Sequence, residues 1–274
     1  MKNKKRLEVV LRTVIMWTLS LVILVPLAMV LLNAVKSQAE AATMSLSLPK
    51  EFHFENFRRV VKEGKMLNAM KNSLFLSVTS VIITNLGAAM GAFVLSRRRT
   101  KVTKGLYVFF LIGLLAPINY IPTIRVLQAL HLMNKMIGVS LLFSALMLPF
   151  DMFLYYGFVG SVPVELDEAA IIDGCNSFQM FFKIAVPLMK PVITTGILIN
   201  FMNSWNDFNI PLYMLNRSEN YPVTMAVYNF YGTYVSSWNL VAAAIIISII
   251  PVLAVYLFGQ KYIVSGMSAG AVKG

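Results

Sequence analysis

Long apolar runs separated by short polar segments make up most of the chain. About 20 residues at 1.5 Å each cross a hydrocarbon core of ~30 Å, so apolar runs beyond roughly 18 residues predict transmembrane helices. Six spans are predicted, at about 13–33, 73–95, 105–127, 137–159, 192–215 and 238–260. The pattern therefore predicts an all-α integral membrane protein that forms a single domain over residues 1–274.

Composition agrees with a membrane protein. Of 274 residues, 58% are hydrophobic and 13% are charged, whereas soluble proteins average about 25% charged. The net charge of +12 lies in short clusters between apolar runs, which indicates membrane lipid as the partner and no nucleic acid. Cys175 is the single cysteine, and His53 and His131 are far apart, so we expect no metal site and no redox chemistry.

Basic clusters predict the orientation. The N-terminus starts like a signal peptide, but its apolar run is longer than the usual 7–15 residues, so we expect an uncleaved first helix. Lys and Arg accumulate in short cytoplasmic segments, and two such clusters occur: Lys2, Lys4, Lys5, Arg6 and Arg12, and Arg97, Arg98, Arg99, Lys101 and Lys104. Both termini and the segment after the fourth span are then cytoplasmic, while the connections around Asn134 and Arg217 face outward.

Two other polar segments lie outside the spans. Residues 36–72 carry Pro49 and charges of both signs, which predicts a small ordered excursion too short for a separate domain. The tail after Lys261 has few large apolar side chains, which predicts a flexible end.

An acidic segment follows the fourth span. Residues 161–173 predict a short helix with Pro163 in its first turn and with Glu165, Asp167 and Glu168 at the positive end of the helix dipole. Gly174 is suited to the left-handed conformation that ends a helix.

A second short helix is predicted directly afterwards. Asn176 is its candidate N-cap, with Gln179 three residues on. An apolar face is expected from Phe178, Phe181, Phe182 and Ala185. Pro187 and Pro191 are expected to close this helix.

Three interpretations of the acidic segment compete. Acid–base catalysis needs paired carboxylates in a cleft with a nucleophile, base or metal nearby, and no histidine lies close in sequence. A solvated loop helix or a docking surface fits the pattern better. The chain is therefore not expected to be an enzyme, and no catalytic residues are assigned.

The spacing favours docking. Glu168 begins an EAA triplet, followed after three residues by Gly174, after nine more by Ile184, and then by Val186 and Pro187. This resembles the cytoplasmic EAA motif of the permease subunits of ATP-binding-cassette (ABC) importers, EAA-x3-G-x9-I-x-L-P, with Val186 in place of the usual Leu. The stretches SWNDFNIPLYML and GMSAGAVKG are similar to the shorter permease subunit of the carbohydrate-importing, maltose-type branch.

The resemblance implies a function and partners. The loop at 160–191, between helices 4 and 5, would be a coupling helix that docks on a separate ATPase through Glu168, Ala169, Ala170, Asp173, Gly174, Ile184, Pro187 and Pro191. The partners would be a second permease subunit in a heterodimer, an ATPase dimer that binds ATP and Mg, and an extracytoplasmic sugar-binding protein. The chain has no G-x4-G-K-[ST] phosphate loop, so we expect it to bind no cofactor. The setting would be a bacterial or archaeal cell (inner) membrane.

Polar residues within the fifth span form a second candidate site: Asn200, Asn203, Trp205, Asn206, Asp207 and Asn209. Amides, a carboxylate and an aromatic ring suit a sugar pathway. Contact between helices and local unwinding before Pro211 are alternatives.

Two further polar residues lie within predicted spans. Asp151 could bond to backbone freed by Pro149 or pair with Arg125. Asn85 precedes small residues suited to close helix packing. The leading hypothesis is thus a permease subunit that forms part of a sugar pathway, and an ion-coupled secondary transporter of a small polar solute is the alternative.

Overall fold

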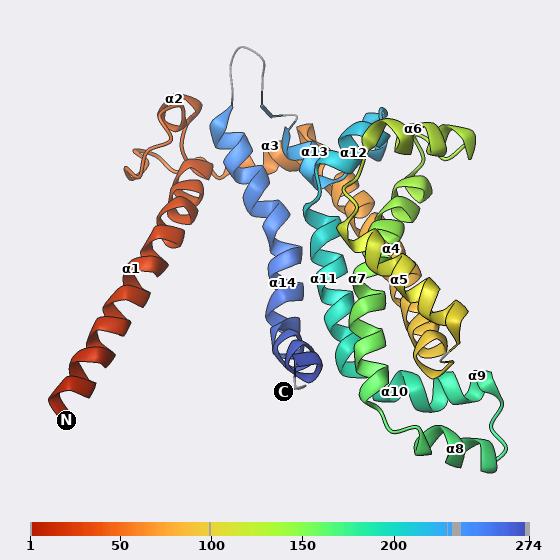
Figure 1. The fold of residues 1–274 in the computed structure, drawn as a ribbon. Coiled ribbons are helices and arrows are strands. Elements are labelled where there is room, and N and C mark those ends of the chain that lie inside the picture. The colour runs from red at the N-terminus through yellow and green to blue at the C-terminus, as the bar shows by residue number, and fades with distance from the viewer. Residues whose placement is uncertain (1, 99, 229, 232–236, 272–274) are drawn as a thin grey trace. The chain divides into compact units, whose positions relative to one another are not determined.

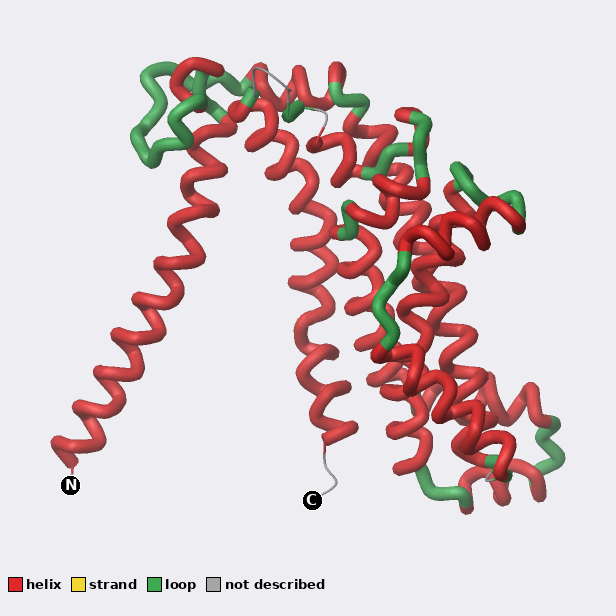
Figure 2. Tube along the Cα trace, turned by 45° about the horizontal axis from the view of Figure 1, so that its top comes forward, coloured by secondary structure: helices red, strands yellow, loops and turns green. Residues whose placement is uncertain are grey.

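The computed structural model describes residues 2–98, 100–228, 230–231 and 237–271, which form helices and no strand (Figures 1 and 2). The chain divides into two compact units, residues 1–67 with 226–250 and residues 68–225 with 251–274.

The first unit holds the N-terminal helix and the polar excursion after it. Its elements are α1 (Lys2–Ala34), α2 (Gln38–Ala41) and α3 (Glu55–Glu63), with the ends of α13 (Val223–Tyr228) and α14 (Trp238–Ala271) that belong to it. The excursion is ordered, as its sequence predicts, because buried amides bind its backbone.

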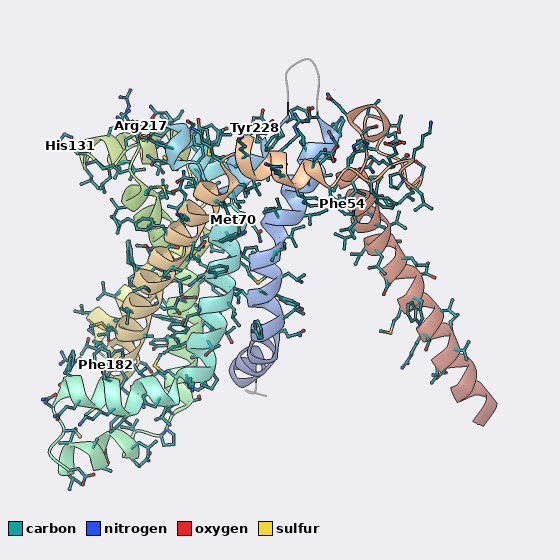
Figure 3. The ribbon with its side chains drawn as sticks, turned by 180° about the vertical axis from the view of Figure 1, so that it is seen from behind. Phe54, Met70, His131, Phe182, Arg217 and Tyr228 are labelled. Atoms are coloured by element: carbon teal, nitrogen blue, oxygen red, sulfur yellow. The ribbon has the colours of Figure 1, made fainter. Side chains whose placement is uncertain are left out.

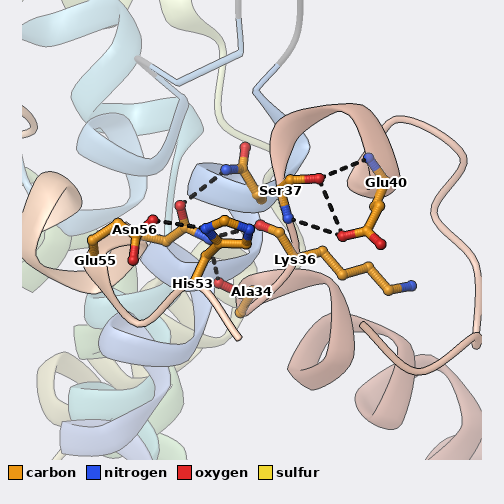
Figure 4. A network of polar contacts seen from close by, with 8 residues as sticks. Ala34, Lys36, Ser37, Glu40, His53, Glu55 and Asn56 are labelled. Atoms are coloured by element: carbon orange, nitrogen blue, oxygen red, sulfur yellow. Dashed lines mark hydrogen bonds and ion pairs between the residues drawn. The ribbon is translucent and has the colours of Figure 1, made fainter. Parts of the chain in front are cut away.

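Asn56 is the centre of this polar packing (Figure 4). Its side-chain amide donates to the carbonyl oxygens of Ala34 and Lys36, both at 2.9 Å, and its Oδ1 accepts from Asn239 at 3.0 Å. His53 Nδ1 lies 2.7 Å from a Glu55 carboxylate oxygen, and this contact raises the pKa of His53. The excursion is therefore fastened to the ends of α1 and α14.

The second unit is a helical bundle that ends in the acidic loop (Figure 1). Its long helices are α4 (Met66–Arg97, from Asn68 on in this unit), α5 (Lys101–Leu115), α7 (Met136–Ser161) and α11 (Lys190–Asn206). Shorter elements are α6 (Tyr120–Ala129), α8 (Glu165–Ile172), α9 (Ser177–Met180), the π-helical turn η1 (Phe181–Ala185), α10 (Val186–Leu188), α12 (Asn209–Met214) and the 3-10 turn η2 (Ser218–Asn220).

Four described helices are long and apolar enough to cross a membrane: Glu8–Ala34, Met66–Arg97, Met136–Ser161 and Trp238–Gln260. A fifth candidate is the pair Ser177–Leu188 and Lys190–Asn206, which is bent by 76°. The protein is thus a multi-pass membrane protein, and the predicted count of six spans stays a prediction.

Two predicted spans contain breaks. The run 105–127 is divided because α5 ends at Leu115 and α6 begins at Tyr120; Ala116 is extended, as expected for a residue before proline. The run 192–215 is divided at Asp207, whose backbone is extended and whose Oδ1 accepts from the Ile210 amide at 2.7 Å. The alternative of local unwinding before Pro211 is confirmed.

Small residues on α4 let it approach α7 closely. Ala88, Ala89 and Ala92 are buried in one core with Met152 of α7, and a Cβ on Gly91 would lie 2.4 Å from the Met152 methyl carbon. The close packing predicted for this stretch of α4 is therefore present.

The connections that precede α7 and follow α12 lie together, away from the acidic loop. The Asn134 amide donates to the Met214 carbonyl at 3.1 Å. Figure 3 shows His131 and Arg217 at one end of this unit and Phe182 of the acidic loop at the other. These two connections and the acidic loop therefore lie at opposite ends of the second unit.

Candidate functional site

The first helix of the acidic loop, α8, is encoded by local signals. Three acids lie in its first turn, Glu165, Asp167 and Glu168, where the helix dipole favours negative charge. The helix begins at Glu165 rather than at Ser161, because α7 itself continues to Ser161 and residues 162–164 form the link.

The end of α8 is a Schellman motif. Gly174 has φ +79, its amide donates to the Ile171 carbonyl at 3.0 Å, and the Cys175 amide donates to the Ala170 carbonyl at 2.9 Å. These two bonds satisfy carbonyls that lack a partner within the helix. The predicted left-handed role of Gly174 is confirmed, and Asp173 is the C-cap beside it.

The second helix also begins as predicted. Asn176 Oδ1 accepts from the Gln179 amide at 2.9 Å, and Gln179 Oε1 accepts from the Asn176 amide at 3.1 Å, which completes a capping box. The chain continues through η1, where a π turn replaces the α pattern, and then through α10 with Pro187. It bends at Met189 before α11, which has Pro191 in its first turn.

The four residues of the predicted apolar face differ in burial. Phe181 and Ala185 are buried together with Met189, in the same core as Val159 and Met152 of α7. Phe178 is 70% exposed and Phe182, which is labelled in Figure 3, is 40% exposed. The predicted apolar face is thus buried only in part. Phe178 and Phe182 pack on each other with ring centres 4.5 Å apart, and Phe182 contacts Phe181 at 4.9 Å, but only Phe181 and Ala185 enter the core.

The apolar side chains of the acidic loop therefore divide into buried and exposed ones. Ala170 of α8 is buried, and Phe181 and Ala185 of η1 pack into the bundle core. Three large apolar side chains at the end of α8 and the start of α9 are exposed, and we call them the apolar tip: Ile171, Ile172 and Phe178. Ile172, at 85% exposed, is among the most exposed apolar side chains of the described part. Exposed apolar clusters of this kind mark contact surfaces.

The remaining predicted loop residues are exposed or half-buried. Glu168 and Ala169 of α8, and Asp173 and Gly174 at its C-terminal end, are exposed. Pro187 of α10 and Pro191 of α11 are also exposed, and Ile184 is half-buried.

A basic residue outside the loop fixes α8 to the bundle. Arg97, in the last turn of α4, places its Nε 2.6 Å from Oδ2 of Asp167. Its Nη1 donates to the carbonyl oxygens of Val159 at 3.2 Å and Val162 at 3.0 Å. Sequence reasoning assigned Arg97 only to the basic cluster, and no local signal links it to Asp167.

Substituting Gly174 tests the Schellman motif. In Gly174→Ala the side chain meets no neighbour, but a left-handed backbone costs an alanine about 1 kcal/mol. We expect amide hydrogen exchange at residues 170–176 to become about fivefold faster, whereas Gly174→Asn should change it less because asparagine tolerates this conformation. Wild-type exchange rates in both variants would contradict the motif's role.

The polar residues of the fifth span do not come together. Asn200 and Trp205 are buried inside the bundle, and Trp205 stacks on Phe201 with ring centres 5.5 Å apart. The Asp207 carboxylate accepts from the Ile210 amide in the first turn of α12. Asn203, Asn206 and Asn209 are exposed.

Asn200 instead belongs to a buried polar cluster that joins three helices. It donates to Asp151 Oδ2 at 2.6 Å. The Tyr155 hydroxyl donates to Asn85 Oδ1 and lies 3.5 Å from the same Asp151 oxygen. Because polar groups in lipid need partners, this cluster acts as a contact between α4, α7 and α11. The helix-contact alternative is favoured for Asn200 and Asn85.

The suggested pair between Asp151 and Arg125 was wrong. Arg125 is exposed on α6 and lies 3.5 Å from Gln128 Oε1. Asp151 is fully buried and faces Asn200. Spacing from Pro149 suggested that Asp151 needs a partner, but it could not identify which helix supplies one.

The chain is similar to known proteins in both its sequence and its fold. The family model of the binding-protein-dependent transport system inner membrane component matches residues 1–269. The probable starch degradation products transport system permease protein AmyC of Thermoanaerobacterium thermosulfurigenes is 31% identical over 93% of both chains. The multiple sugar-binding transport system permease protein MsmG of Streptococcus mutans is 31% identical over 100% of both chains.

A solved structure shares the fold. A chain of a bacterial ABC transporter involved in the import of the acidic polysaccharide alginate superposes with a TM-score of 0.84 at 23% identity, covering 94% of this chain and 96% of that one.

Proposed function

This chain belongs to the family of binding-protein-dependent transport system inner membrane components, and from that premise we propose that it couples a separate ATPase to the import of a sugar or oligosaccharide. It is a transport permease of a multi-pass membrane type, and its family works with a binding protein. The relatives named above are permeases for starch degradation products and for multiple sugars, which supports the sugar class.

One observation carries the coupling role. The acidic loop is closed by a Schellman motif and a capping box, is packed into the bundle by Phe181, Ala185 and Met189, and yet exposes the apolar tip. A flexible loop would absorb a push, whereas a packed one transmits it to the helices. The apolar tip gives a partner protein a surface to bind.

The remaining assignments follow from this role. The loop and both termini lie in the cytoplasm, where an ATPase dimer binds ATP and Mg; this chain catalyses no reaction. A second permease subunit completes the pathway. Asn203, Asn206 and Asn209 are the exposed polar residues that could contact a hydroxyl-rich solute. Asn200 and Trp205 support the helices instead.

Co-purification tests the proposal. The tagged chain is extracted from its native membrane in mild detergent, and its partners are identified by mass spectrometry. We expect an ATPase and a second permease, and we expect ATP hydrolysis by the complex. A chain that purifies alone, together with uptake driven by a proton or sodium gradient without ATP, would support the ion-coupled alternative and overturn the proposal.

A further inference from the structure

Arg97 makes one ion pair and two hydrogen bonds, each to a different part of the loop region. The guanidinium contacts the Asp167 carboxylate of α8, the Val159 carbonyl in the last turn of α7 and the Val162 carbonyl in the link after α7. Its own Cα lies at the end of α4. One side chain thus joins α4, α7, the link and α8.

The pair between Arg97 and Asp167 differs from the other charges of this region. Its side chains are 14% and 12% exposed, whereas neighbouring Arg98, Lys101, Glu165 and Glu168 are exposed. Phe93, Leu188 and Met189 border the same hollow and limit its contact with solvent. Exposed ion pairs contribute little, but breaking a shielded pair leaves a charge without compensation.

All three contacts of the Arg97 guanidinium are electrostatically favourable. Carbonyl oxygens at the end of α7 carry the negative end of its dipole, and a guanidinium there is favourable. Asp167 lies at the positive end of α8 and adds a full negative charge beside the same guanidinium. Arginine has five donors in a planar fork and can bind these acceptors together, whereas a lysine ammonium is a single point.

Resting on the proposed function, we propose that Arg97 is a positioning residue that makes α8 move as one body with α4 and α7. Without it, the covalent connection from α7 to α8 is the link 162–164, and the described side chains of α4 make no other polar contact with α8. With it, a displacement of α8 by the ATPase reaches α4, which is remote from the loop in sequence. The ion pair between Arg97 and Asp167 therefore determines how much of the movement imposed by the ATPase is transmitted to the helical bundle.

The test separates coupling from assembly. The whole importer, co-purified with the tagged chain, is placed in proteoliposomes, and ATP hydrolysis is measured with uptake of radiolabelled maltotriose or raffinose, whichever the wild type transports. In Arg97→Ala and in Asp167→Asn we expect basal hydrolysis within about twofold of wild type and sugar transported per ATP lowered about tenfold, as for loss of one partner of a shielded charge pair. Arg98→Ala, which removes an adjacent exposed charge, is the matched control and should behave as wild type.

Two further variants sharpen the result. Because the two residues act through one contact, Arg97→Ala combined with Asp167→Asn should lower the ratio no further than the more damaging single change. Arg97→Lys should transport more sugar per ATP than Arg97→Ala but less than wild type.

Losses that multiply in the double variant, or an unchanged ratio in the single ones, would overturn the proposal. If Arg97→Ala fails to assemble, the near-isosteric Asp167→Asn decides by the same criterion. A wild-type complex without ATP hydrolysis would instead overturn the proposed function, and the inference with it.

Discussion

Replacing Ile172 with Asp should release the ATPase from the permease while leaving the permease folded. Ile172 is 85% exposed at the apolar tip, so its substitution removes no internal packing. Centrally placed contact residues commonly contribute about 2 kcal/mol or more to binding, which corresponds to a roughly thirtyfold weaker complex. The amount of ATPase recovered with the tagged chain, and the ATP hydrolysis of that preparation, measure the effect.

A second variant excludes melting of the helix as the cause. A carboxylate at Ile172 lies at the C-terminal end of α8, where the dipole disfavours it by about 0.3–1 kcal/mol. Phe178→Asp places a carboxylate in the first turn of α9, where the dipole favours it. Both variants should lose the ATPase. Leu48→Asp, at a 78% exposed apolar position in the first unit, is the control and should retain it; full recovery of ATPase with both tip variants would show that the tip is not the docking surface.

Replacing Gly196 with Ala should destabilise the bundle. Gly196 lies on α11 against the buried polar cluster, and a Cβ there would be 2.0 Å from the Tyr155 hydroxyl oxygen and 3.0 Å from Asn85 Oδ1. Tyr155 is fully buried, so it has little freedom to move away. We expect a loss of about 1–3 kcal/mol, typical of overpacking, seen as a lower thermal unfolding temperature in detergent.

Two controls isolate the steric cause. Gly157→Ala, on α7, meets nothing within 4 Å and should be neutral or slightly stabilising because alanine favours helix. Combining Gly196→Ala with Tyr155→Phe removes the closest atom and should recover part of the stability. Equal unfolding temperatures for Gly196→Ala and Gly157→Ala would contradict a tight contact at this position.

Sequence predicts the loop where its structure depends on neighbours in the chain. Gly174 and Asn176 act on residues within a few positions, so a Schellman motif and a capping box are legible without a structure. The exposure of Phe178 and Phe182 was not, because the packing of Phe181 and Ala185 against α4 and α7 involves residues far away in the sequence.

Long-range partners explain the remaining differences. Arg97 and Asp167 are joined across α5, α6 and α7, and Arg97 stands among basic residues that a positive-inside pattern already accounts for. Likewise, polar residues in the fifth span suggested one solute-binding group. Their helical positions separate Asn200, which faces Asp151, from Asn203 and Asn206, which are exposed. The residue types indicated polar side chains suited to a solute. Only the packing of α7 against α11 shows which of them contact another helix and which are exposed.

The Schellman motif that ends α8 and the capping box that begins α9 follow one another directly, and this has a consequence for how the protein is synthesised. Every bond of the Schellman motif and the capping box lies within residues 170–179, and Arg97, Val159 and Val162 all precede α8 in the chain. During synthesis the loop can therefore close and attach to the helices already made before α11 leaves the ribosome. The nascent chain would then form the loop early, before the next span is inserted, and insertion of that span would start from a fixed point.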